Sequence, residues 1–119
     1  MILTVLLLAQ GASVLETLDE RDLCQIITRN VSAYRGQTIG LFTVETAAAN
    51  CPAKRIQVGF RLSVAEQNRA STVDGFMNTA REGVCSADPT MQAFRRRGWK
   101  FEYTFLRPDG SKDVRTLTC

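Results

Sequence analysis

The chain of 119 residues contains no histidine. Ser–His and Cys–His catalysis both need an imidazole as the general base, so neither is possible, and imidazole metal sites are excluded too. The chain also lacks a glycine-rich phosphate loop and a C-x-x-C pair, which excludes a P-loop nucleotide site and a compact zinc or redox motif. We therefore expect no cofactor and no bound metal.

Carboxylates are the remaining candidates for acid–base catalysis. A small hydrolase would use side chains such as Glu20 or Glu45 in a carboxylate pair. Acidic residues do cluster near the first of these, at Glu16, Asp19, Glu20 and Asp22. The first turn of a helix explains this cluster more simply, because the helix dipole favours negative charge there. We expect a protein that is not an enzyme, and a carboxylate-dependent hydrolase is the alternative.

The N-terminal segment is apolar but short. Residues 2–9 are hydrophobic apart from Thr4, small residues follow up to Ala12, and the sequence then becomes polar. This pattern is typical of a secretory signal peptide, and it is too short for a transmembrane helix of about 20 apolar residues. No basic residue precedes the run, and a buried strand or helix is the alternative. We predict a signal peptide over residues 1–12, one domain over residues 13–119, and a periplasmic or secreted protein with no membrane span after processing.

The four cysteines are widely spaced, at Cys24, Cys51, Cys85 and Cys119. A zinc site would need one thiolate from each of four separate elements, whereas an even number of separated cysteines in an exported protein is typical of disulfides. Several pairings are possible. We favour Cys24–Cys51 and Cys85–Cys119, because each bridge then lies within one half of the chain. Four buried thiols in a cytosolic protein are the alternative.

Periodicity predicts secondary structure in the order α-β-β-α-α-β-β. Capping signals for helices occur at Thr17 with Glu20, at Ser71–Asp74, and at Asp88 before a proline. Strands are predicted at residues 39–46, 55–64, 99–105 and 112–118, with a loop over residues 47–54 and a turn at 108–110. We expect an α+β fold, in which an antiparallel sheet of about four strands carries two to three helices on one face.

Two of these strands alternate strictly between apolar and polar residues. The first places Ile56, Val58 and Phe60 on one face, and the second places Trp99, Phe101, Tyr103 and Phe105 there. Alternation with a period of two indicates a buried face and a solvent face. The solvent face carries Arg55, Arg61 and Lys100, and we predict it as the binding surface.

A basic run, Arg95, Arg96 and Arg97, precedes the aromatic strand and extends the predicted binding surface. Basic residues beside aromatics are typical of single-stranded nucleic acid sites. A cytosolic nucleic-acid-binding domain that uses Arg95–Lys100 is therefore a further alternative. The helix dipole accounts for the arginines and a buried strand face accounts for the aromatics, so we expect no nucleic acid partner.

The last third of the chain carries a recognisable pattern, Val84–Cys85, Pro89-x-Met91, Gly98, Phe101-x-Tyr103 and Asp109–Gly110. It resembles small secreted bacterial proteins that include the family of quorum-sensing-regulated virulence factors. The resemblance implies an exported, virulence-associated α+β protein without an established activity, and it transfers no catalytic residue to this sequence. We therefore expect a disulfide-stapled module that binds an unidentified protein or envelope macromolecule.

Overall fold

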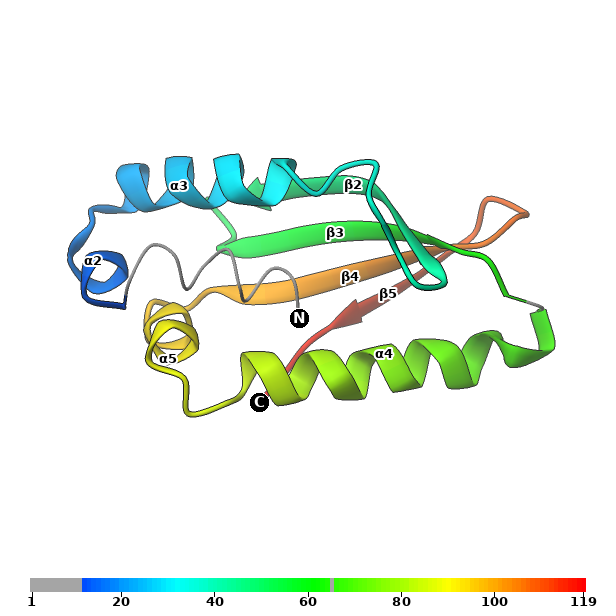
Figure 1. The fold of residues 1–119 in the computed structure, drawn as a ribbon. Helices are drawn as coiled ribbons and strands as arrows, with labels where there is room; N and C mark the ends of the chain where they lie inside the picture. Colours follow the sequence, from blue (N-terminus) through cyan, green and yellow to red (C-terminus); the bar gives the residue numbers. More distant parts are fainter. Residues whose placement is uncertain (1–11, 65) are drawn as a thin grey trace.

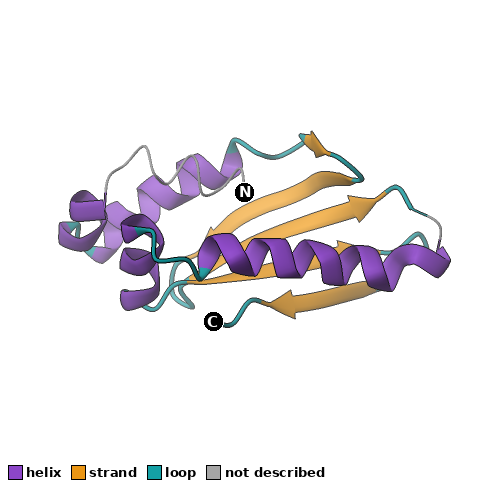
Figure 2. Cartoon of the chain, turned by 60° about the horizontal axis from the view of Figure 1, so that its bottom comes forward, coloured by secondary structure: helices purple, strands orange, loops and turns teal. Residues whose placement is uncertain are grey.

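The computed structural model describes residues 12–64 and 66–119, which form a five-stranded sheet with the order β1-β2-β3-β4-β5. Helices α3 and α4 lie along one face of the sheet, and α2 and α5 lie side by side at one end (Figures 1 and 2). The elements are α2 (Ala12–Thr17), α3 (Glu20–Ser32), β1 (Thr38–Ile39), β2 (Phe42–Asn50), β3 (Arg55–Leu62), a 3₁₀ turn (Glu66–Asn68), α4 (Arg69–Val84), α5 (Pro89–Arg96), β4 (Lys100–Leu106) and β5 (Lys112–Thr116). The predicted signal peptide lies outside the described residues except for Ala12, the first residue of α2.

The sheet is mostly antiparallel, but its central pair of strands is parallel. β2 and β3 form one antiparallel hairpin and β4 and β5 form the other, whereas β3 and β4 run in the same direction. The chain leaves the end of β3 and returns through α4 and α5, and such a crossover is what a parallel pair requires. The α+β class is therefore confirmed, but the sheet has five strands where about four were expected, and one pair in it is parallel where an antiparallel sheet was expected.

The additional strand arises from a tight turn in a segment predicted as one strand. Gly40 has a positive φ of 59°, and the chain folds back there so that β1 pairs with the start of β2. β2 then continues to Asn50, beyond the predicted end of the strand. Alanines 47–49 have a low intrinsic preference for strands, which favours the loop prediction, but their pairing with β3 determines the conformation.

The first long helix begins at a different cap from the one expected. Asp19 is the N-cap of α3, and its carboxylate accepts a hydrogen bond of 2.8 Å from the backbone amide of Asp22. Thr17, the predicted cap, is instead the last residue of α2. Thr and Asp are both good N-cap residues. Because α2 extends to Thr17, the break between the two helices comes after this residue and Asp19 becomes the cap.

The second long helix also begins earlier than predicted. α4 starts at Arg69, directly after the 3₁₀ turn, so Ser71–Asp74 lies inside the helix. The hydroxyls of Ser71 and Thr72 donate hydrogen bonds to the carbonyl oxygen of Asn68 and do not cap the helix. The third helix follows the prediction: the carboxylate of Asp88 caps α5, and Pro89 is its first residue.

The hydrophobic core lies between the helices and the inner face of the sheet. Tyr103 and Phe105 of β4 have no exposed surface, and Phe60 of β3 stacks on both. The helices contribute the residues that helical periodicity predicts, namely Leu23, Ile27 and Val31 of α3 and Val73, Met77, Ala80 and Val84 of α4. Trp99 is buried as predicted, but it precedes β4.

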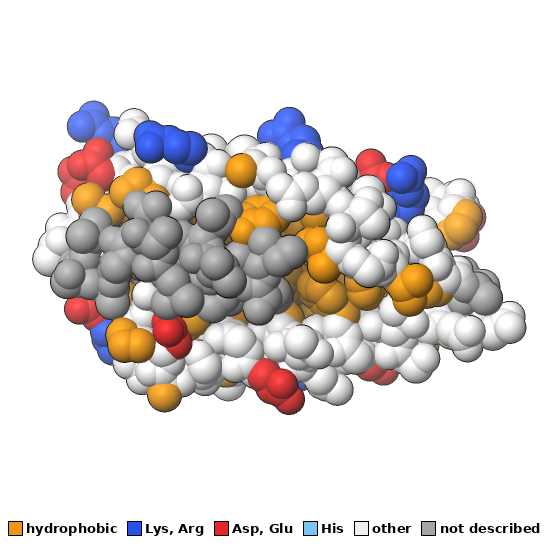
Figure 3. All heavy atoms as spheres, viewed as in Figure 1, with side chains coloured by type: hydrophobic (Ala, Val, Ile, Leu, Met, Phe, Trp, Pro, Cys, Tyr) orange, Lys and Arg blue, Asp and Glu red, His pale blue; other side chains and the backbone are white. Residues whose placement is uncertain are grey.

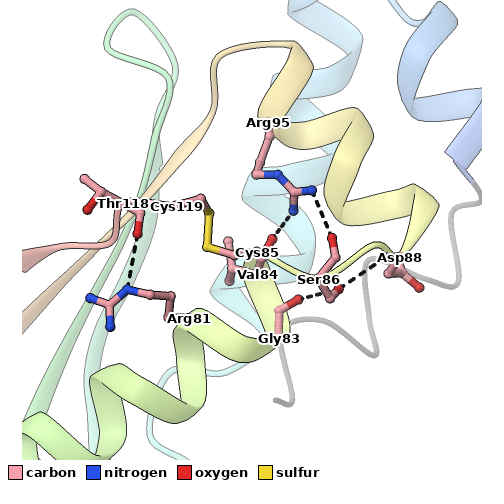
Figure 4. Close-up of a disulfide and its surroundings, with 9 residues drawn as sticks. All are labelled: Arg81, Gly83, Val84, Cys85, Ser86, Asp88, Arg95, Thr118 and Cys119. Carbon is pink, nitrogen blue, oxygen red and sulfur yellow. Dashed lines mark hydrogen bonds between the residues drawn. A yellow bond between two sulfur atoms is a disulfide. The ribbon is translucent and has the colours of Figure 1, made fainter.

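Each disulfide connects a long helix to a segment that borders the sheet. Cys24 of α3 is bonded to Cys51 in the β2–β3 turn, and Cys85 at the end of α4 is bonded to Cys119 (Figure 4). These are the two pairs expected from the sequence. Because each bridge closes a helix onto the sheet, the pair of bridges fixes both sides of the core.

Candidate binding surfaces

Arg95 of the basic run supports the end of α4. Its guanidinium donates hydrogen bonds to the carbonyl oxygens of Val84 and Ser86, the latter at 2.9 Å, on both sides of the Cys85 disulfide (Figure 4). The last carbonyls of a helix have no partner within the helix, and a basic side chain is a common way to satisfy them. Arg95 therefore has a structural role.

Arg97 connects α5 to the junction between α2 and α3. Its Nη1 donates to the carbonyl oxygens of Leu15 at 2.8 Å and Leu18 at 2.6 Å, and its Nη2 donates to the carboxylate of Glu20 at 2.8 Å. The side chain is only 16% exposed. Arg96, the next residue towards the N-terminus, points to the surface and forms an ion pair with Glu16. All three arginines of the run thus have partners within the chain.

Glu20, the first carboxylate considered for a hydrolase, is one of the partners of Arg97. The hydrogen bond from Arg97 holds the pKa of Glu20 below its usual value, and the charge of Lys54 adds to this effect. A general acid needs a raised pKa, so the shift has the wrong direction for that role. The second carboxylate, Glu45 on β2, forms an ion pair of 3.1 Å with Arg61. No cluster of three side chains suited to a metal occurs in residues 12–64 and 66–119.

Replacing Arg97 with alanine is expected to lower the free energy of unfolding by about 1.5–3 kcal/mol, because two carbonyl oxygens lose a charged donor. Arg96→Ala is the matched control, and it is expected to cost at most about 1 kcal/mol, as for other exposed ion pairs. Urea unfolding followed by circular dichroism measures both. Equal costs for the two variants would contradict the role assigned to Arg97.

The outer face of the sheet carries the other three predicted cations, and none of the described helices covers it. Arg61 is neutralised by Glu45, as above. Arg55 and Lys100 lie directly opposite each other across the parallel pair β3–β4. Neither forms an ion pair with any described residue, although Glu102 lies further along the same face, where it accepts a hydrogen bond of 3.2 Å from Gln57. The structure therefore leaves two adjacent cations without a close acidic partner.

The helix side of the sheet contains a pocket that the sequence does not predict. It has a volume of about 470 Å³ and opens between α4 and the β1–β2 turn. Hydrophobic side chains are visible in the hollow between the helices (Figure 3). Its lining comes from the sheet, from the turn and from the middle of α4. The only local signal for it is Gly75, a glycine in the interior of an amphipathic helix.

Gly59 in β3 and Gly75 in α4 differ in what surrounds them. A Cβ added to Gly75 in α4 would meet no heavy atom within 4 Å, whereas one added to Gly59 in β3 would collide with the Thr46 hydroxyl at the β-bulge of β2. We expect Gly75→Ala to raise the free energy of unfolding by about 0.8–1 kcal/mol, from helix propensity alone. Gly59→Ala is expected to lower it. Chemical denaturation of both variants checks the two signs, and a destabilised Gly75→Ala protein would contradict the open surroundings of this residue.

No protein-family model, no curated protein and no solved structure matches this chain. Within the described part of the chain, no helix has the length and apolar character needed to cross a membrane.

Proposed function

We propose that this protein is exported and acts in an oxidising compartment as a small binding module for an anionic polymer of the cell envelope. Its two disulfides support the assignment to an oxidising compartment, because such bridges persist in oxidising surroundings. The signal-like residues 1–12 and the resemblance to small secreted bacterial proteins support export. The proposed contact surface is the outer face of the sheet, centred on Arg55 and Lys100.

The assignment of this surface rests on one observation. Arg55 and Lys100 are directly opposite each other on the neighbouring strands β3 and β4. Like charges directly opposite each other destabilise a sheet, and no described acidic residue lies within ion-pair distance of either. An anionic group placed between the two cations would remove the repulsion and form two charge-assisted hydrogen bonds. A face that no described helix covers suits an extended polymer, and such binding is expected to weaken as salt concentration rises.

The surface is tested by Arg55→Glu combined with Lys100→Glu, with heparin as the polyanionic probe. We expect binding to weaken by about tenfold or more, which corresponds to about 1.4 kcal/mol of lost attraction. Arg21→Glu with Arg29→Glu is the matched control, because both side chains are cationic and lie on α3 away from the face. The assignment fails if the charge reversal leaves heparin affinity unchanged, or if the control loses as much.

Export is tested by the intact mass of the protein from its native cells, with and without reductant before alkylation. We expect the loss of about twelve N-terminal residues, as for a cleaved signal peptide. We also expect the four cysteines to be alkylated only after reduction. A full-length chain with free thiols would contradict export.

A further inference from the structure

The pocket on the helix side of the sheet has the size of a small-molecule site. Its volume of about 470 Å³ falls within the range of about 300–1,000 Å³ that such sites occupy. The floor is formed by Val58, Phe60 and Tyr103 of the sheet. One wall is the middle of α4, and the other is the β1–β2 turn with Tyr34, which follows α3. The pocket is therefore built from several separate elements, as ligand sites commonly are.

The chemistry of the lining indicates an uncharged occupant. None of the described lining residues is ionised at neutral pH, and most are aliphatic or aromatic. A charged ligand would lose its hydration there without gaining a partner of opposite charge among the described lining residues, at a high free-energy cost. Phe42, Phe60 and Phe76 present ring faces and edges to one another at centroid distances of 4.8–5.6 Å. Such surfaces pack well against hydrocarbon chains and flat rings.

Two glycines leave space at the pocket. Gly40 has a positive φ, so the turn itself accounts for a glycine there. Gly75 has helical neighbours on both sides, and a Cβ at this position would meet no heavy atom within 4 Å. Neither backbone conformation nor close packing against described residues requires a glycine at position 75. A larger side chain there would project from the lining of the pocket.

We propose that this pocket binds one uncharged, predominantly hydrocarbon small molecule, and that Gly75 determines the size of ligand admitted. Leu41, which is 48% exposed and lines the pocket, would be covered by such a ligand. The pocket opens on the helix side of the sheet, whereas Arg55 and Lys100 are on the outer side. The ligand site is therefore independent of the polyanion surface proposed above, and each is tested separately.

The test uses the full oxidised chain and N-phenyl-1-naphthylamine, an uncharged fluorescent probe. We expect saturable binding with an increase in fluorescence, and a loss of affinity of at least about tenfold in Gly75→Leu, because the added side chain occupies ligand space. Gly75→Ala is the matched control and is expected to stay within about threefold of the original affinity. Both variants are expected to unfold at a higher temperature, because both improve helix propensity. A binding loss that accompanies a gain in stability is the signature of a filled pocket.

A second variant and an independent control distinguish a filled pocket from a folding defect. Thr79→Phe, one turn further along α4, is expected to weaken probe binding as Gly75→Leu does, while Thr79→Ala retains it. The Arg55→Glu, Lys100→Glu protein is expected to bind the probe normally.

Several results would overturn the proposal. They are an absence of probe binding to the folded protein, or binding by Gly75→Leu and Thr79→Phe that is as tight as binding by the original protein. Probe binding that begins only after removal of residues 1–11 would make the chain's own N-terminal residues the occupant. A dimer in solution that Gly75→Leu dissociates would make a second copy the occupant.

Discussion

Phe105→Ala is expected to lower the free energy of unfolding by about 3–5 kcal/mol, the range for large aromatic residues in a packed core. Phe105 has no exposed surface. Its ring lies 5.6–6.0 Å, between centroids, from those of Phe42, Phe60 and Phe76. These rings come from three other elements, so truncation leaves a cavity that no single element can close. Urea unfolding, monitored by the fluorescence of the single tryptophan, measures the loss.

Val114→Ala is the control for this experiment. Val114 lies on the neighbouring strand β5 and is 54% exposed, so its truncation is expected to change stability by less than about 0.5 kcal/mol. If Phe105→Ala costs no more than the control, the aromatic cluster does not form the centre of the core. Phe105→Leu keeps more of the side-chain volume and is expected to cost less than Phe105→Ala.

The buried faces were predictable because burial leaves a local periodic pattern. Strict alternation in β3 and β4 identifies Phe60 and Phe105 as inward-facing, and helical spacing identifies the stripe from Leu23 to Val31 in α3. The α5 cap at Asp88 was predictable for a similar reason, since a cap and a proline at the first helical position are signals within two residues.

The arrangement of the strands was not predictable from such patterns. Whether β3 and β4 pair as parallel neighbours depends on where α4 returns the chain, and alternation within a strand is the same for either direction. The break at Gly40 is a related case, because an apolar residue on each side of it extends the strand pattern through the turn. The start of α4 was misplaced since Ser71–Asp74 has the composition of a cap but lies inside the helix.

The candidate sites depend on contacts between residues far apart in the sequence. Six cations were predicted as a binding surface, and nothing local distinguishes Arg61, which pairs with Glu45, from Arg55, which has no such partner. Arg97 binds the carbonyl of Leu15, a residue 82 positions earlier in the chain. The pocket is a space between elements and therefore leaves no motif, although a glycine inside a helix is a sign that something other than helix stability matters there.

Removing the Cys85–Cys119 bridge by replacing both residues with serine is expected to lower the free energy of unfolding by about 3.5–4 kcal/mol, from the loop entropy returned to the unfolded chain. The bridge joins residues 34 positions apart. The folded junction keeps other contacts, among them the hydrogen bond of 3.2 Å from Arg81 to the carbonyl of Thr118 (Figure 4). The native structure is therefore expected to persist in the absence of denaturant, with a lower urea midpoint.

The matched comparison is the removal of the Cys24–Cys51 bridge, whose residues are 27 positions apart, for which the expected loss is similar. The two loops do not overlap in the sequence, so their contributions are expected to add, to about 7 kcal/mol when both bridges are reduced. A domain of this size has about 5–15 kcal/mol in total, so reduction removes much of its stability. The fold would then depend on an oxidising compartment, as the proposed function requires. Equal stability of the oxidised and fully reduced protein would remove that dependence and with it the main support for export.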